Sequence, residues 1–105
     1  MGVLAMNFVV LFLAGAFLCN SVPHVVSGLQ GVPFPTPFAK PRGIGKSPPV
    51  VNFLWGILNL VLGLFLLGEQ PVSVGFNPQF ATVLIGALAF GIYLSRHFGK
   101  VRRDS

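Results

Sequence analysis

Residues 50–67 have the sequence VVNFLWGILNLVLGLFLL, an unbroken run that contains no charged side chain. A helix of this length covers roughly 27 Å at 1.5 Å per residue, close to the ~30 Å hydrocarbon core of a bilayer. Ser47 and Pro48, just before the run, are typical of a helix start, as a capping side chain and a first-turn proline. The turn residues 68–71 (GEQP) end the run. We therefore predict a transmembrane helix over about residues 48–68.

A second apolar stretch begins near the N-terminus and covers about residues 3–22. Pro23 is expected to end this helix, because proline lacks a backbone donor and clashes with the preceding turn. A cleaved signal peptide is the competing interpretation. It is disfavoured because residues 1–4 (MGVL) contain no lysine or arginine, and cleavage after Ala14 or Ala16 would leave only a short apolar region.

A third apolar stretch covers about residues 78–97. Asn77 is a suitable N-cap and Pro78 suits the first helical position, where no backbone donor is needed. Gly99 is a suitable C-terminal cap. We therefore expect the helix to end near this glycine and residues 98–105 to form a basic C-terminal tail.

The composition agrees with a membrane protein. Of the 105 residues, 53% are hydrophobic and only 9% are charged, against about 25% charged in a typical soluble domain. The mean hydropathy is +0.80. These values exclude a soluble globular domain and a disordered chain, and the single cysteine, Cys19, excludes a disulfide-rich module. The expected fold is all-α, a three-helix transmembrane bundle in one domain, with a long Pro/Gly-rich loop (residues 23–47) between the first two helices.

The positive charges indicate an orientation. With three spans, all seven basic residues fall on one side of the membrane, three in the first loop and four near the C-terminus: Lys40, Arg42, Lys46, Arg96, Lys100, Arg102 and Arg103. The positive-inside rule makes that side cytoplasmic, so the N-terminus is expected outside and the C-terminus inside the cell membrane. Nucleic acid is not an expected partner, because the basic residues flank apolar spans and are not spread over a folded surface.

Small and polar residues recur at helical spacing inside two of the spans. In the second span they are spaced four, three and four residues apart, which places them on one helix face: Asn52, Gly56, Asn59 and Gly63. The third span repeats the pattern with Thr82, Gly86, Ala89 and Tyr93, and the pair Ala87 and Gly91 lies on a neighbouring face.

Two interpretations of this polar seam remain open. In the first, small residues let helix backbones approach and the asparagine amides hydrogen-bond between helices. In the second, Asn52 and Asn59 line a path for a solute. Packing is favoured, because the apolar parts of the spans (residues 3–22, 50–67 and 80–94) contain no aspartate, glutamate, lysine or arginine of the kind that coupled carriers use.

Residues 23–49, the first loop with the start of the second helix, contain seven of the nine prolines, which favour an extended backbone. One interpretation is a loop on the cytoplasmic face, in which Phe34 and Phe38 dip into the interface while Lys40, Arg42 and Lys46 meet anionic head groups. The other, equally weighted, is a lid over the ends of the helices.

Motifs for catalysis are missing from the sequence. His24 and His97 have no neighbouring carboxylate or thiol, so we predict no catalytic residues, no metal site and no cofactor. The expected function is a non-enzymatic membrane protein of the packing or interaction type. Its expected partners are the lipid bilayer and a second copy or a larger membrane protein. The alternative is a subunit of an oligomeric transporter or channel lined by Asn52 and Asn59.

Overall fold

The computed structural model describes residues 2–104, with side chains described from residue 8 onward. Within this range the regular structure is three long helices and one two-stranded hairpin of two residues per strand: α1 (Gly2–Leu29), β1 (Phe34–Pro35), β2 (Lys46–Ser47), α2 (Pro49–Gly68) and α3 (Pro78–Asp104). All three helices are long and apolar enough to cross a membrane, which confirms the expected all-α class with three candidate spans.

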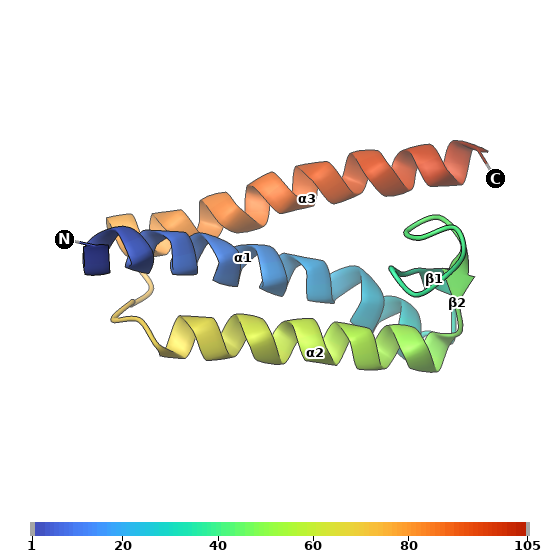
Figure 1. Ribbon diagram of the computed structural model, residues 1–105, viewed down its shortest axis with the longest axis horizontal. Coiled ribbons are helices and arrows are strands. Elements are labelled where there is room, and N and C mark those ends of the chain that lie inside the picture. Colours follow the sequence, from blue (N-terminus) through green and yellow to red (C-terminus); the bar gives the residue numbers. More distant parts are fainter. Residues whose placement is uncertain (1, 105) are drawn as a thin grey trace.

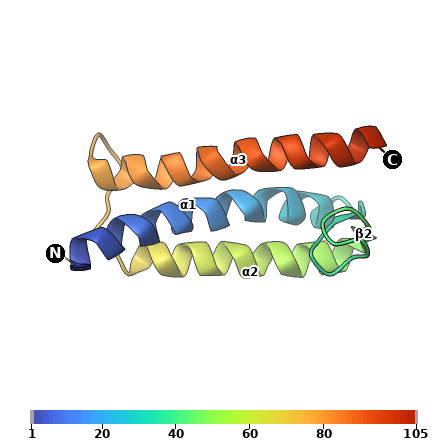
Figure 2. The same ribbon diagram turned by 45° about the horizontal axis from the view of Figure 1, so that its top comes forward.

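Helix α1 is the central element of the fold. It lies between α2 and α3, and its N-terminal part is closer to α3 while its C-terminal part is closer to α2 (Figures 1 and 2). Helices α2 and α3 hardly contact each other. The described chain is elongated, 46 × 24 × 24 Å, and its long axis is comparable with the ~40–45 Å thickness of a whole bilayer. The arrangement is therefore an open row of three helices, and not a closed bundle in which each helix contacts the other two.

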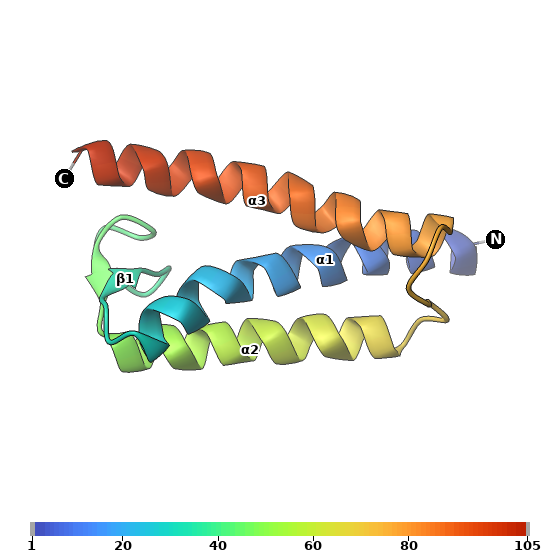
Figure 3. The same cartoon turned by 180° about the vertical axis from the view of Figure 1, so that it is seen from behind.

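The two ends of the molecule differ. One end carries the N-terminus and the short connection between α2 and α3, while the other carries the hairpin, the start of α2 and the C-terminus (Figures 1 and 3). The hairpin lies beside the last turns of α1 and α3. We call this the hairpin end.

The prediction that Pro23 ends the first helix is wrong. Helix α1 passes through Pro23 and continues to Leu29, so the connection to α2 is residues 30–48 and not 23–47. Proline is tolerated inside membrane helices because neighbouring groups compensate for the lost backbone bond. Here the added turns are held against α2: a Cβ placed on Gly28 would lie 2.6 Å from the Cβ of Phe53.

The predicted end of the third helix is also wrong. Helix α3 continues through Gly99 to Asp104, so most of the expected basic tail is helical, and Ser105 lies outside the described residues. A glycine inside a helix costs only about 1 kcal/mol. Tertiary contacts outweigh that cost, because the ring of Phe98 packs on Phe34 of the hairpin at a centroid distance of 4.6 Å.

The helix starts differ in their caps. The N-cap of α2 is Pro48, which makes no side-chain capping bond, so Ser47 is not the cap that its position suggested. The Ser47 hydroxyl instead hydrogen-bonds the hydroxyl of Thr36 across the hairpin. In α3 the expected cap is confirmed: the amide of Phe80 donates to Oδ1 of Asn77 at 2.7 Å, and Pro78 is the first helical residue.

Removing the α3 cap is expected to destabilise the protein modestly. Asn77→Ala deletes the acceptor for the first-turn amide of Phe80 and should cost about 1 kcal/mol. Asn77→Ser keeps a capping oxygen and is expected to retain most of the stability. Thermal unfolding of the purified protein in one detergent measures both, and equal losses for the two variants would show that the cap contributes nothing.

Candidate functional site

The connection between α1 and α2 folds back on itself at the hairpin end. Strands β1 and β2 pair in antiparallel fashion, with Phe34 opposite Ser47 and Pro35 opposite Lys46. The turn between them is fixed by Thr36, whose carbonyl accepts the amides of Ala39 and Gly43. Only 1% of Thr36 is exposed. We call this folded connection, residues 30–48, the lid.

Asn52 connects this lid to the helices. Its side chain is fully buried at the first turn of α2, and its Nδ2 donates to the carbonyl oxygens of Phe34 at 2.9 Å and Ser47 at 3.1 Å, with a longer contact to Pro48. Its Oδ1 accepts a hydrogen bond from Nδ1 of His24 on α1 at 2.8 Å. One amide therefore joins α1, α2 and both strands.

Aromatic rings surround His24, which is 2% exposed. The rings of Phe34, Trp55 and Phe98 meet the imidazole edge-on, with centroids 5.6–6.4 Å away. These rings come from the hairpin, α2 and α3, so the histidine lies where all the elements of this end meet. Its hydrogen bond to Asn52 connects α1 to the first turn of α2.

His97 makes the corresponding connection from α3. Its Nε2 donates to the carbonyl of Gly43 at 2.6 Å, and its ring stacks on Tyr93 at a centroid distance of 6.1 Å. Gly43 has a positive φ of 68°, so the turn that presents this carbonyl requires glycine. Both histidines thus hold the lid, one from α1 and one from α3. Among the described residues no group of three or more histidine, cysteine, aspartate or glutamate side chains is placed to hold a metal ion.

The structure places all four seam residues of α2 on its buried face, against α1. A Cβ on Gly56 would lie 2.6 Å from the backbone nitrogen of Val25, and one on Gly63 would lie 2.7 Å from Cγ of Leu18. Asn59 is 2% exposed. Its Oδ1 accepts a hydrogen bond from Nδ2 of Asn20 at 3.0 Å, and its own Nδ2 donates to the carbonyl of Trp55.

The proposed seam of α3 is only partly on a helix interface. A Cβ on Gly86 would collide with the carbonyl of Phe12 on α1. Thr82, however, is half-buried and donates to the carbonyl of Pro78 in its own helix, and Ala89 is exposed. The contact face includes Val83, Gly86 and Leu94, which are buried. The predicted face of α3 only partly matches this contact face, because the buried positions carry large residues as well as small ones. A pattern of small residues alone therefore located only one side of the contact face.

The two loop phenylalanines have different surroundings. Phe34 is directed inward, against His24 and Phe98, and so does not dip into the interface as one interpretation had it. Phe38 is 62% exposed, and its ring meets Trp55 edge-on at 5.0 Å. Lys40, Arg42 and Lys46 have exposed side chains.

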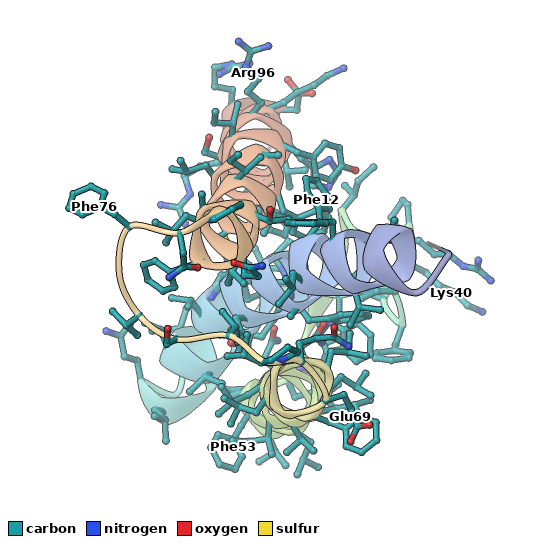
Figure 4. All side chains as sticks on the ribbon, turned by 90° about the vertical axis from the view of Figure 1, so that its left-hand side faces the viewer. Phe12, Lys40, Phe53, Glu69, Phe76 and Arg96 are labelled. Carbon is teal, nitrogen blue, oxygen red and sulfur yellow. The ribbon has the colours of Figure 1, made fainter. Side chains whose placement is uncertain are left out.

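All seven lysines and arginines belong to the hairpin end, either in the connection between α1 and α2 or in the last turns of α3. Glu69, at the end of α2, lies at the opposite end of the molecule. Figure 4, which looks along the helices from that opposite end, shows Arg96 and Lys40 projecting outward in different directions. The hairpin end is therefore a cationic surface built around a buried polar cluster.

Sequence reasoning missed the α1 side of this cluster. Asn20, His24 and Ser27 are spaced four and three residues apart, the same spacing as the seam of α2. His24 and Ser27 are buried, and Asn20 bonds Asn59. The signal was present in the sequence, but it runs across Pro23, where the helix was expected to end.

Comparisons of the chain with protein-family models, with curated proteins and with solved structures found no match. Function is therefore inferred from the geometry of this chain alone.

Proposed function

We propose that this chain is a small, non-enzymatic, multi-pass protein of the cell membrane that acts by binding, with its hairpin end as the contact surface for anionic lipid. The observation that carries the proposal is the gathering of all seven basic residues around a folded, internally bonded lid. Each lysine or arginine near an anionic membrane surface contributes about 1 kcal/mol. The cytoplasmic leaflet carries such lipids, so the C-terminus is cytoplasmic and the N-terminus outside.

The membrane-embedded faces support the binding of further protein. The outer sides of α2 and α3 expose large apolar residues that suit lipid tails, among them Leu54, Leu58, Leu84 and Leu88. Because α2 and α3 do not close against each other, α1 also borders a groove lined by Leu13, Phe17, Asn20, Trp55 and Phe90. A second copy of the chain or a larger membrane protein is the proposed occupant of this groove.

Burial of Asn52 and Asn59 weighs against the alternative function, a subunit of a transporter or channel. A pore lined by Asn52 and Asn59 needs amides that reach water, yet both are buried and bonded within the chain. We expect the purified protein in liposomes to conduct no ions or small solutes. In a pore lined by these residues, Asn52→Leu/Asn59→Leu would abolish flux, because an apolar constriction loses its water. Reproducible flux that disappears in this variant would contradict the proposal and favour a transporter or channel subunit.

Cysteine labelling in intact cells is expected to reach only the end opposite the hairpin. In a Cys19→Ser background, a membrane-impermeant maleimide should label Val74→Cys, which is 86% exposed in the connection between α2 and α3. Phe38→Cys in the hairpin should be labelled only after the membrane is permeabilised. Labelling of Phe38→Cys in intact cells would reverse the proposed orientation.

A further inference from the structure

Asn20 lies in the middle part of the candidate span Phe8–Leu29 and lines the groove that α1 forms with α2 and α3. Its Nδ2 donates one hydrogen bond, to Oδ1 of Asn59 at 3.0 Å. The second amide hydrogen and the carbonyl oxygen of Asn20 have no partner among the residues that the structure describes. We propose that Asn20 pairs with Asn20 of a second copy of the chain, and that the two copies form a dimer through this groove. The inference rests on the proposed function, which assigns the groove to a protein partner.

The surroundings of Asn20 select the kind of partner. Inside the hydrocarbon core, polar groups need partners from protein, because lipid tails offer neither a donor nor an acceptor. A lipid in the groove would therefore leave both free groups of Asn20 unpaired. The partner has to supply one donor and one acceptor at the depth of Asn20, which is what another amide side chain does.

A second copy meets both requirements by symmetry. A two-fold axis along the membrane normal places each residue of one copy at the same depth as its equivalent in the other, and brings the same surface of both copies together. Each Asn20 can then donate its free hydrogen to Oδ1 of the other. Two reciprocal hydrogen bonds form, and the bonds to Asn59 within each copy are kept.

The face of α1 around Asn20 is open for such a contact. Val9, Leu13 and Ala16 precede Asn20 at spacings of four, three and four residues, so the four share one helix face. We call them the open strip. Val9 is 60% exposed and Leu13 is 43% exposed, although both lie in the central helix of the fold. The small side chain of Ala16 lets a second helix approach the strip closely.

Another exposed side of α1 has no such requirement. Val22, Val26 and Leu29 are exposed there, spaced four and three residues apart. Their side chains carry no hydrogen-bonding group, so lipid tails cover this side without leaving a polar atom unpaired. The two sides therefore differ in chemistry, and Val22 provides a control position for the open strip.

Sedimentation equilibrium of the full chain in a density-matched mild detergent tests the asparagine pair. The wild type should form dimers, and Asn20→Leu should raise the dissociation constant of the dimer about tenfold or more, because it removes two interhelical hydrogen bonds. Asn59→Leu is the matched control. It removes the same bond within the chain but keeps Asn20, so it should change the dissociation constant less than about threefold. Unchanged circular dichroism shows that each variant is folded.

Oxidative cross-linking in native membranes tests the face without relying on Asn20. In a Cys19→Ser background, Leu13→Cys on the open strip should form a disulfide-linked dimer when copper phenanthroline is added as the oxidant. Val22→Cys, which is at least as exposed at its position but lies on the other side of α1, should remain monomeric. Ala16→Leu should reduce the cross-linking of Leu13→Cys, because the larger side chain holds the two helices apart.

Three results would overturn the dimer: equal effects of Asn20→Leu and Asn59→Leu, equal cross-linking of Leu13→Cys and Val22→Cys, or a wild type that stays monomeric in both experiments. A monomeric chain whose Leu13→Cys variant cross-links to a different protein would assign the groove to a larger membrane partner instead. Retention of phosphatidylglycerol over phosphatidylcholine, measured on the same sample by native mass spectrometry, reports the hairpin end separately. A monomer that keeps this preference would overturn the dimer alone, whereas a dimer without it would overturn the proposed lipid contact alone.

Discussion

Replacing Gly86 with alanine is expected to destabilise the protein, whereas the same replacement at Gly99 in the same helix is expected to leave it as stable or more stable. A Cβ on Gly86 would collide with the backbone carbonyl of Phe12, and backbone atoms cannot rotate away. Overpacking of this kind costs about 1–3 kcal/mol. At Gly99 the added Cβ meets only the tip of Arg103, 3.8 Å away, so the better helix propensity of alanine contributes up to about 1 kcal/mol.

Thermal unfolding in a single detergent, followed by circular dichroism, measures the difference between the two variants. Gly91→Ala provides an intermediate case, because its Cβ would lie 3.2 Å from Sγ of Cys19, a side-chain atom that can move. The melting temperature is expected to be highest for Gly99→Ala, lower for Gly91→Ala and lowest for Gly86→Ala. Equal melting temperatures for the first and last would show that α1 and α3 do not approach as closely as the structure has them.

Replacing Asn52 with leucine is expected to release the hairpin from the helices. The substitution removes the amide that donates to the carbonyls of Phe34 and Ser47, and it leaves Nδ1 of the buried His24 without its acceptor. Each buried polar group left unpaired costs about 1–3 kcal/mol, so a loss of about 3 kcal/mol is expected. Asn59→Leu removes only a side-chain bond to Asn20 and one to the carbonyl of Trp55, and it should cost roughly 0.6–2 kcal/mol.

Hydrogen exchange distinguishes these two variants by location. In the native hairpin the amides of Ala39 and Gly43 donate to the carbonyl of Thr36, and those of Ile44 and Gly45 donate to Pro41. Asn52→Leu should accelerate their exchange about a hundredfold, as expected for a loss of about 3 kcal/mol. Asn59→Leu should leave it unchanged. Equal acceleration in both variants would show that the asparagine of the hairpin end has no special part in holding the lid.

The helices were predictable because their signals are local. A run such as residues 50–67 must form a helix in a bilayer, where every backbone polar group needs a partner within the segment. The cap of α3 was predictable for the same reason, since Asn77 and the amide it accepts are three residues apart. The spacing of Asn52, Gly56, Asn59 and Gly63 also placed them on one face before any partner helix was known.

Helix ends and the fold of the loop were not predictable in this way. Pro23 and Gly99 disfavour helix locally, yet α1 and α3 continue past them because the added turns pack on α2 and on the hairpin. In the loop, prolines suggested an extended chain, but the Thr36 and Ser47 hydroxyls pair across eleven residues. Such bonds depend on which distant groups meet, and periodicity carries no information about that.

The sequence by itself determined that the chain has three apolar helices and that every lysine and arginine lies in the segments at one of their ends, because length, hydropathy and charge order are properties of the chain. Only the tertiary structure decided that α1 lies between α2 and α3, that His24 and Asn52 join the lid to the helices, and that Asn20 lines an open groove. Those features depend on contacts between residues tens of positions apart, and close packing selects them only when all the elements are in place.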